Sequence, residues 1–278
     1  GDAAALAAPS AELKKVLREI DVIHKLRDQH CMQHIGSYLH KGCIYLITER
    51  ADYGSINDIV HHLGSLSETQ IRAVSKSVLR ALSYLHNHKI LHRNVKPTVI
   101  YAYRNGLVKL GGFAVARKTG KSTNKSRLFT LIGTPRFMAP ELILPKIEKM
   151  KAGGDEEDAD EGAVYSSTID VWALGISCLQ MAETKPPYFD INPMRALFLI
   201  SSNEPPTLKD KSRWSREFQS FLSQTLIKDQ YKRPGSEAML SHPFVASAPH
   251  HLNLKLLREQ KGGDAEGDDS YDDNDDGD

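Results

Sequence analysis

Apolar residues in the first part of the chain recur mostly at helical spacing, interrupted by one run with the composition of a strand. Residues 11–27 (AELKKVLREIDVIHKLR) alternate apolar and charged positions with the period of an amphipathic helix. Residues 43–49 (CIYLITE) are rich in β-branched and aromatic side chains and predict a strand. Helices are predicted over 55–64, which starts at a serine cap, and over 68–88.

The rest of the chain is predicted to be mainly helical. Residues 90–103 and 106–113 predict a loop and two short strands that meet around Arg104-Asn105-Gly106. Residues 168–182 (TIDVWALGISCLQMA) are mostly apolar on every side, which predicts a buried helix. Two or three more helices are expected before residue 243. The pattern as a whole predicts an α+β fold with a little β structure first and a large helical body after it.

The net charge of +1 hides two strongly acidic segments. Residues 152–163 carry six acidic residues and residues 262–278 carry nine, with no base in either segment. The remainder of the chain therefore has a net charge of about +16, from 36 basic residues and the remaining acidic ones. With so few apolar residues, both segments are expected to be disordered. They are interpreted either as solubility tails or as segments that dock onto the basic body.

Composition excludes several classes of protein. The bases are scattered without interleaved aromatics, which argues against a nucleic-acid-binding protein. No apolar run approaches the roughly 20 residues of a membrane span, and residues 1–10 lack the features of a signal peptide. Three scattered cysteines argue against a disulfide framework, and the histidines at 86–92 have no cysteine cluster for zinc. A cytoplasmic protein without a metal is expected.

Five motifs, in the same order, resemble those of protein kinases. They are LHRNVKPTVI (91–100), KLGGFAVA (109–116), TLIGTPRFMAPEL (130–142), DVWALGI (170–176) and KRPGSEAMLSHPF (232–244). The segment 185–200 (KPPYFDINPMRALFLI) is similar to the sterile-20 group, in its Hippo-like branch. The resemblance covers residues 11 to about 257.

The resemblance implies a bilobal protein-kinase-like fold with a truncated β N-lobe and a mainly helical C-lobe. Residues 1–10 would form a flexible N-terminus and 11–50 a partial N-lobe with helix C. Residues 51–257 would form the C-lobe, interrupted by the acidic disordered insert at about 145–165. Residues 258–278 would be an acidic disordered tail.

Three positions depart from the catalytic pattern of the family. Kinases use an Asp to accept the proton of the substrate hydroxyl and an Asn and an Asp to hold Mg²⁺. Asn94 stands at the proton-acceptor position, Val99 at one metal-ligand position and Gly112 at the other. An amide carries no negative charge, and neither valine nor glycine offers the side-chain oxygen that Mg²⁺ requires. No intact catalytic set and no metal site are therefore expected.

The resemblance also assigns the residues around a nucleotide. Lys96 is retained from the catalytic loop, and Glu19 matches the helix C glutamate that pairs with a strand lysine. That lysine and a glycine-rich loop are not found upstream. Thr48 matches the gatekeeper, and Glu49 and Ala51 belong to the hinge that contacts adenine. Tyr101 stands under the adenine ring and is expected to fill part of the pocket, so ATP binding without metal is left open.

Other matching residues have structural or regulatory roles in the family. Thr130 matches a phosphorylated threonine and Arg93 the arginine that receives the phosphate, as a switch or as a relic. The structural set comprises an apolar spine with its F-helix anchor and a buried ion pair: Ile23, His92, Phe113, Asp170, Glu141 and Arg233.

The sequence therefore predicts a pseudokinase that acts as a scaffold or as an allosteric partner in intracellular signalling. The expected partners are an active protein kinase and a helical-repeat scaffold, because these are the partners that sterile-20-like pseudokinases use. The alternative is an active or weakly active ATP-dependent serine/threonine kinase. A third interpretation is a fragment without a stable fold. Asn94, Val99 and Gly112 separate the first interpretation from the second.

Overall fold

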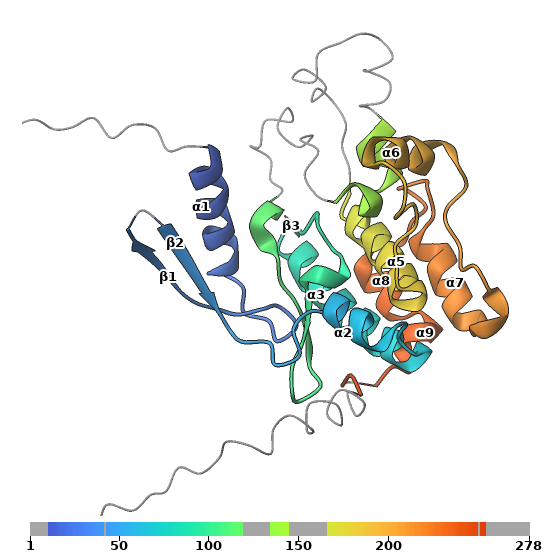
Figure 1. Cartoon of the computed structure of the whole chain (residues 1–278), viewed down its shortest axis with the longest axis horizontal. Helices are drawn as coiled ribbons and strands as arrows, with labels where there is room; N and C mark the ends of the chain where they lie inside the picture. Colours follow the sequence, from blue (N-terminus) through green and yellow to red (C-terminus); the bar gives the residue numbers. More distant parts are fainter. Residues whose placement is uncertain (1–10, 42, 119–133, 145–165, 250, 254–278) are drawn as a thin grey trace, which may run out of the picture.

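The computed structural model describes residues 11–41, 43–118, 134–144, 166–249 and 251–253 (Figure 1). Several predicted features lie outside the described residues: the N-terminus at 1–10, the segment 119–133 with Thr130, the acidic insert at about 145–165 and the acidic tail at 258–278. Predictions about them are not tested by the structure.

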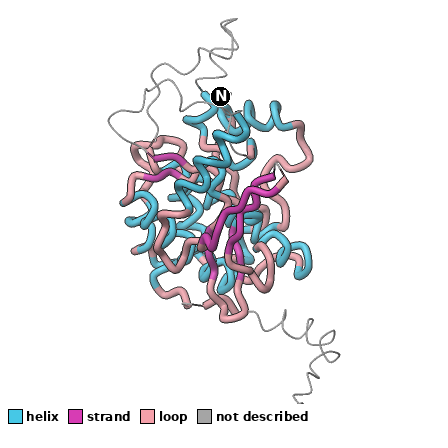
Figure 2. The backbone as a smooth tube through the Cα atoms, turned by 90° about the vertical axis from the view of Figure 1, so that its left-hand side faces the viewer, coloured by secondary structure: helices cyan, strands magenta, loops and turns pink. Residues whose placement is uncertain are grey.

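The N-terminal part consists of one helix and a two-stranded antiparallel sheet. Helix α1 (Ala11–Ile23) is followed by β1 (His34–His40) and β2 (Cys43–Thr48), which pair along their length (Figure 2). The predicted helix over 11–27 ends earlier, because Lys25 and Leu26 donate to the carbonyls three residues before them and form a tighter turn. The strand β1 was not predicted, since its sequence HIGSYLH has no regular alternation of apolar and polar residues.

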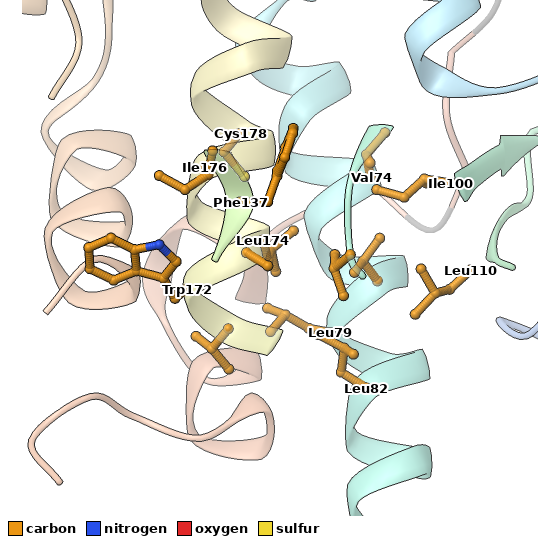
Figure 3. Packing of buried hydrophobic residues seen from close by; sticks show 14 of the residues in the cluster. Val74, Leu79, Leu82, Ile100, Leu110, Phe137, Trp172, Leu174, Ile176 and Cys178 are labelled. Atoms are coloured by element: carbon orange, nitrogen blue, oxygen red, sulfur yellow. The ribbon is translucent and has the colours of Figure 1, made fainter. Parts of the chain in front are cut away.

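Two long helices form the centre of the large body. Helix α3 (Glu68–Asn87) begins with a capping box formed by Ser67 and Gln70, and α5 (Thr168–Glu183) is buried over nearly its whole length. Apolar side chains of α3 pack on α5 on one side and on Ile100 and Leu110 of a neighbouring strand pair on the other (Figure 3). The short helix α2 (Ile56–Leu63), capped by Ser55, packs on the same core. These three helices agree with the sequence prediction.

The remaining elements are short. The strands are β3 (Ile90–Leu91), β4 (Ile100–Ala102), β5 (Val108–Leu110) and β6 (Arg117–Lys118). The 3₁₀ turns are η1 (Pro97–Val99), η2 (Phe113–Val115), η4 (Pro135–Phe137) and η6 (Lys211–Arg213). The helices are α6 (Pro193–Ser202), α7 (Arg216–Thr225), α8 (Ser236–Leu240) and α9 (Pro243–Ala246).

The strand pair β4–β5 carries the site. It pairs Ile100 with Leu110, Tyr101 with Lys109 and Ala102 with Val108, and Gly106 turns the chain between the strands with a φ of +81°. The catalytic-loop segment enters β4 and the Gly111-Gly112 segment leaves β5, so the antiparallel pairing brings the two segments together.

No helix in the described part of the chain is both long and apolar enough to cross a membrane.

Candidate functional site

Asp170 holds the start of the loop that contains Asn94. Its carboxylate accepts hydrogen bonds from the backbone N–H groups of His92 (3.0 Å) and Arg93 (2.7 Å), and His86 Nε2 lies 2.8 Å from it. Burial raises the pKa of the Asp170 carboxyl, but hydrogen bonds and the charges of nearby histidines outweigh this effect and the net shift is downward. Arg93 has a φ of +65°, a conformation that L-residues rarely adopt, and these bonds stabilise it.

Asn94 and Lys96 belong to this loop, and both lie beside Thr134, which comes from the separate segment that precedes η4. Asn94, Thr134 and Phe137 line one small recess, and the Asn94 N–H donates to His92 Nδ1 at 3.3 Å. Lys96 Nζ donates to Thr134 Oγ1 at 2.7 Å, and burial lowers the pKa of Lys96. An amide at position 94 offers an oxygen acceptor but no negative charge with which to accept a proton.

Val99 and Gly112 face each other across the strand pair. Gly112 has a φ of +73°, and a Cβ atom added to it would lie 2.5 Å from Val99 Cγ1 and 2.8 Å from Val99 Cβ. Both distances are far below van der Waals contact. The valine therefore occupies the space that any side chain at 112 would need. The two positions assigned to metal ligands are in contact, and both present only hydrocarbon or backbone.

These residues do not fit the magnesium ions that the kinase family uses. Mg²⁺ takes oxygen ligands in a near-octahedral arrangement. Position 99 offers a hydrocarbon and position 112 has no side chain. Within the described ranges, no cluster of three or more His, Cys, Asp or Glu residues has the geometry of a metal site.

Tyr101 lies against Gly111, the residue before Gly112. A Cβ atom on Gly111 would lie 2.9 Å from the ring carbon Cε2 of Tyr101 and 3.2 Å from Met32 Sδ. The Tyr101 side chain is half-buried, and this burial raises its pKa. The tyrosine thus packs directly on the segment that precedes Gly112.

An ion pair joins the hinge to strand β5. Lys109 Nζ donates to the two carboxylate oxygens of Glu49 at 2.6 and 2.8 Å, and the Gln33 N–H donates to the same carboxylate at 2.7 Å. Thr48 ends β2 just before Glu49, and Ala51 is partly buried two residues after it. Lys109 was missed by the sequence analysis, although a lone lysine in the apolar run 107–110 was a signal for a buried partner.

The residues assigned to the apolar spine are buried together. The rings of His92 and Phe113 meet edge to face with centroids 5.3 Å apart, and His92 Nε2 lies 2.8 Å from the Gly111 carbonyl. Ile23 is buried at the end of α1, which packs on the turn η2 containing Phe113. The fully buried His92 has a lowered pKa because burial disfavours its charged form.

Glu19 and Arg93 have different surroundings. Glu19 projects from α1, and its pKa is raised by burial alone. No ion pair of Glu19 occurs among the described residues. Arg93 Nε donates to the Val115 carbonyl at 2.8 Å. The structure thus places Arg93 beside the segment that leads toward Thr130, while Thr130 itself is outside the described residues.

Arg233 and Glu141 form a bidentate ion pair. The guanidinium of Arg233 donates to both carboxylate oxygens of Glu141, at 2.7 and 3.0 Å, and to the Thr168 and Ile227 carbonyls. The Arg233 side chain is completely buried. This arrangement ties the helical turn at 140–144 to the start of α5.

Comparisons with known proteins identify the family of this chain. The protein kinase domain family model matches residues 5–245. Mitogen-activated protein kinase kinase kinase kinase 3 of Homo sapiens is 37% identical over 253 residues, which are 90% of this chain and 26% of that protein.

Two further relatives have similar identity. Serine/threonine-protein kinase cst-1 of Caenorhabditis elegans is 35% identical over 88% of this chain and 46% of its own length. Serine/threonine-protein kinase 4 homolog B of Dictyostelium discoideum is 35% identical over 84% of this chain and 20% of its own length. The chain thus spans between a fifth and a half of these relatives. The family match and the α+β architecture confirm the predicted fold class, and this chain belongs to the protein kinase domain family, in its sterile-20 group.

Proposed function

We propose that this chain is a pseudokinase, a sterile-20-like kinase domain whose catalytic site is impaired. The contact between Val99 and Gly112 carries the proposal. It puts a valine side chain into the space that a side chain at 112 would need, so neither position offers a side-chain oxygen to a metal ion. A metal-bound phosphate clamp is the main source of catalysis in this family.

Asn94 removes a second requirement of the reaction. General acid–base catalysis is typically worth about 10²–10⁴ in rate. The amide at position 94 has no carboxylate to accept the proton of a substrate hydroxyl. The loss of proton acceptor and metal clamp together leaves only the positioning part of the machinery.

The parts that maintain the fold are retained. The spine contact of His92 with Phe113, the bonds to Asp170 and the ion pair of Arg233 with Glu141 are all in place. A domain that keeps this framework without the catalytic groups is suited to binding. We therefore propose a cytoplasmic role as a scaffold or allosteric partner of an active protein kinase, together with a helical-repeat scaffold.

The second candidate is a weakly active serine/threonine kinase. It is favoured by the hydrogen bond from Lys96 to Thr134, which keeps a catalytic-loop lysine positioned. The relatives are themselves named as kinases. This candidate requires metal ligands from outside positions 99 and 112.

Phosphate transfer from labelled ATP to a basic protein substrate, with Mg²⁺ and with Mn²⁺, tests the proposal. The wild type is expected to give no transfer above the Lys96→Met variant. The triple variant Asn94→Asp/Val99→Asn/Gly112→Asp serves as a comparison, and its melting curve shows whether it folds. Wild-type transfer that is lost in Lys96→Met would establish the weakly active kinase instead.

Affinity capture of the whole protein from cells tests the partner. An active kinase or a helical-repeat protein is expected among the captured proteins, and capture is expected to be unchanged in Asn94→Ala. Recovery of neither class of protein would count against the scaffold role.

A further inference from the structure

A groove of about 590 Å³ lies between the extended segment 204–208 and helix α7. It shares no residue with the candidate site. Most of its lining is apolar and comes from Pro205, Pro206, Leu208, Leu222, Leu226 and Ile227. The three leucines are almost completely buried, so the partly exposed Pro205, Pro206 and Ile227 supply the accessible apolar surface, which is suited to an aromatic side chain.

One lysine, Lys211, lines the groove, and a second, Lys228, directly follows the lining residue Ile227 in the chain. Lys211 lines it beside the first half of α7, where Gln219 Nε2 donates to the Lys211 carbonyl at 2.9 Å. The Nζ of Lys228 donates to the Ser201 and Asn203 carbonyls. An ammonium has three N–H donors, so these two bonds leave one.

The surroundings of the groove are mildly basic. Segment 203–228 carries five basic and three acidic residues. One of the acids, Glu204, lines the groove. Another, Asp210, accepts hydrogen bonds from the N–H and the hydroxyl of Ser212. The groove therefore favours an occupant with acidic residues on both sides of an apolar group.

The chain itself contains such a sequence. Residues 262–278 hold nine acidic residues and a single aromatic, Tyr271, which stands between Asp268-Asp269 and Asp272-Asp273. An extended segment from 268 to 273 spans about 17 Å. Helix α7, with ten residues, is about 15 Å long, so the extended segment 268–273 is comparable in length to the helix that lines one side of the groove.

The tail is long enough to reach the groove. The described chain ends at Asn253, whose carbonyl accepts a hydrogen bond from Gln70 at the start of α3. Eighteen further residues lead to Tyr271 and extend up to about 60 Å. A compact domain of this size is roughly 45 Å across. Docking within one molecule also benefits from an effective concentration of about millimolar order.

We propose that the acidic segment 262–278 docks in this groove of its own chain. Tyr271 lies between the two prolines and α7, and the aspartates on either side of it face Lys211 and Lys228. The inference does not depend on whether the kinase site is active. The charge-assisted part of the contact weakens as salt screens it.

Hydrogen exchange of the whole protein tests this docking. Relative to the wild type, Tyr271→Ala and Lys211→Glu are each expected to raise exchange at least threefold in peptides covering 204–208 and 219–227. Tyr231→Ala is the matched control, because Tyr231 is 87% exposed and lies outside the groove. Exchange that is equal in wild type and Tyr271→Ala would overturn the proposal. Protection that grows with protein concentration would also overturn it, in favour of a tail from a second copy.

Disulfide trapping gives a second readout that needs no loss of stability. In a Cys43→Ser background, Ser223→Cys combined with Ser270→Cys is expected to form an intramolecular disulfide under mild oxidation. Ser223 is exposed and lines the groove. Thr98→Cys with Ser270→Cys is the control, since Thr98 is exposed in the turn η1. Equal trapping in both pairs would contradict docking at the groove.

Discussion

The ammonium of Lys109 lies within 2.8 Å of both carboxylate oxygens of Glu49, although the lysine comes from strand β5 and the glutamate from the end of β2. The pair connects the β1–β2 hairpin to the strand that leads into Gly111 and Gly112. Lys109 also lies over the ring of Tyr103, with Nζ 4.9 Å from the centroid. Both charged side chains are largely removed from water.

Lys109→Met is expected to destabilise the protein by about 2–3 kcal/mol. Removing one partner of a buried pair typically costs about 3–5 kcal/mol, and Glu49 keeps some contact with water. Urea unfolding measures the loss. The double variant Lys109→Met/Glu49→Gln is the control and should recover part of it, because no unpaired charge remains. A double variant as unstable as the sum of the two single variants would show that the ion pair is not the cause.

Gly112→Ala is expected to cost about 2–4 kcal/mol, because it combines a positive φ with overlap against Val99. The cost should fall by at least 1 kcal/mol in a Val99→Ala background, since the Cγ atom in contact is then absent. A double-mutant cycle from urea unfolding gives this coupling. An additive cycle would mean that the backbone at 112 moves away from Val99 without resistance.

Stability is expected to fall as the pH drops below about 6.5. Buried His92 has a pKa below its ordinary value, so the unfolded chain binds a proton before the native state does. Each such histidine contributes up to about 1.4 kcal/mol per pH unit between the two pKa values. The contribution is intact above the unfolded pKa and is lost as the pH falls toward the folded one.

His92→Gln is expected to reduce this slope between pH 6.5 and 5, measured as the unfolding free energy at each pH. His30 and His242 also have pKa values lowered by burial and should account for what remains. An unchanged slope in His92→Gln would mean that His92 does not titrate in this window.

Tyr101→Leu is expected to increase the affinity for a fluorescent ATP analogue at least tenfold, because it removes the ring that packs on Gly111. Magnesium should not change the affinity, since positions 99 and 112 offer no ligand. Fluorescence titration with and without EDTA measures both effects. Wild-type binding as tight as that of the variant would show that the tyrosine leaves the pocket open.

The helices were predictable where local signals were strong. Ser55 and Ser67 mark the starts of α2 and α3, and the apolar run at 168–182 marks α5. The strand β1 was missed because Gly36 and the flanking histidines hide its alternation. The end of α1 was placed too late, since the apolar spacing continues through Leu26 although the backbone tightens into a turn.

The residue types of the candidate site were evident from the motifs, but their mutual contacts were not. Asn94, Val99 and Gly112 were identified as departures from the family pattern. That Val99 occupies the space of a side chain at 112 depends on the pairing of β4 with β5, which no local signal specifies. The partner of Glu49 was hidden for the same reason, because Lys109 lies 60 positions away along the chain.

The packing of Val99 on Gly112 makes the order of mutational steps matter. A single change of Gly112→Asp introduces a side chain into occupied space, and a single change of Val99→Asn adds a polar group without completing a metal site. Restoring a carboxylate at 112 therefore requires Val99 to shift or to change as well. The two positions constrain each other's evolution, because the side chain at one decides which residues fit at the other.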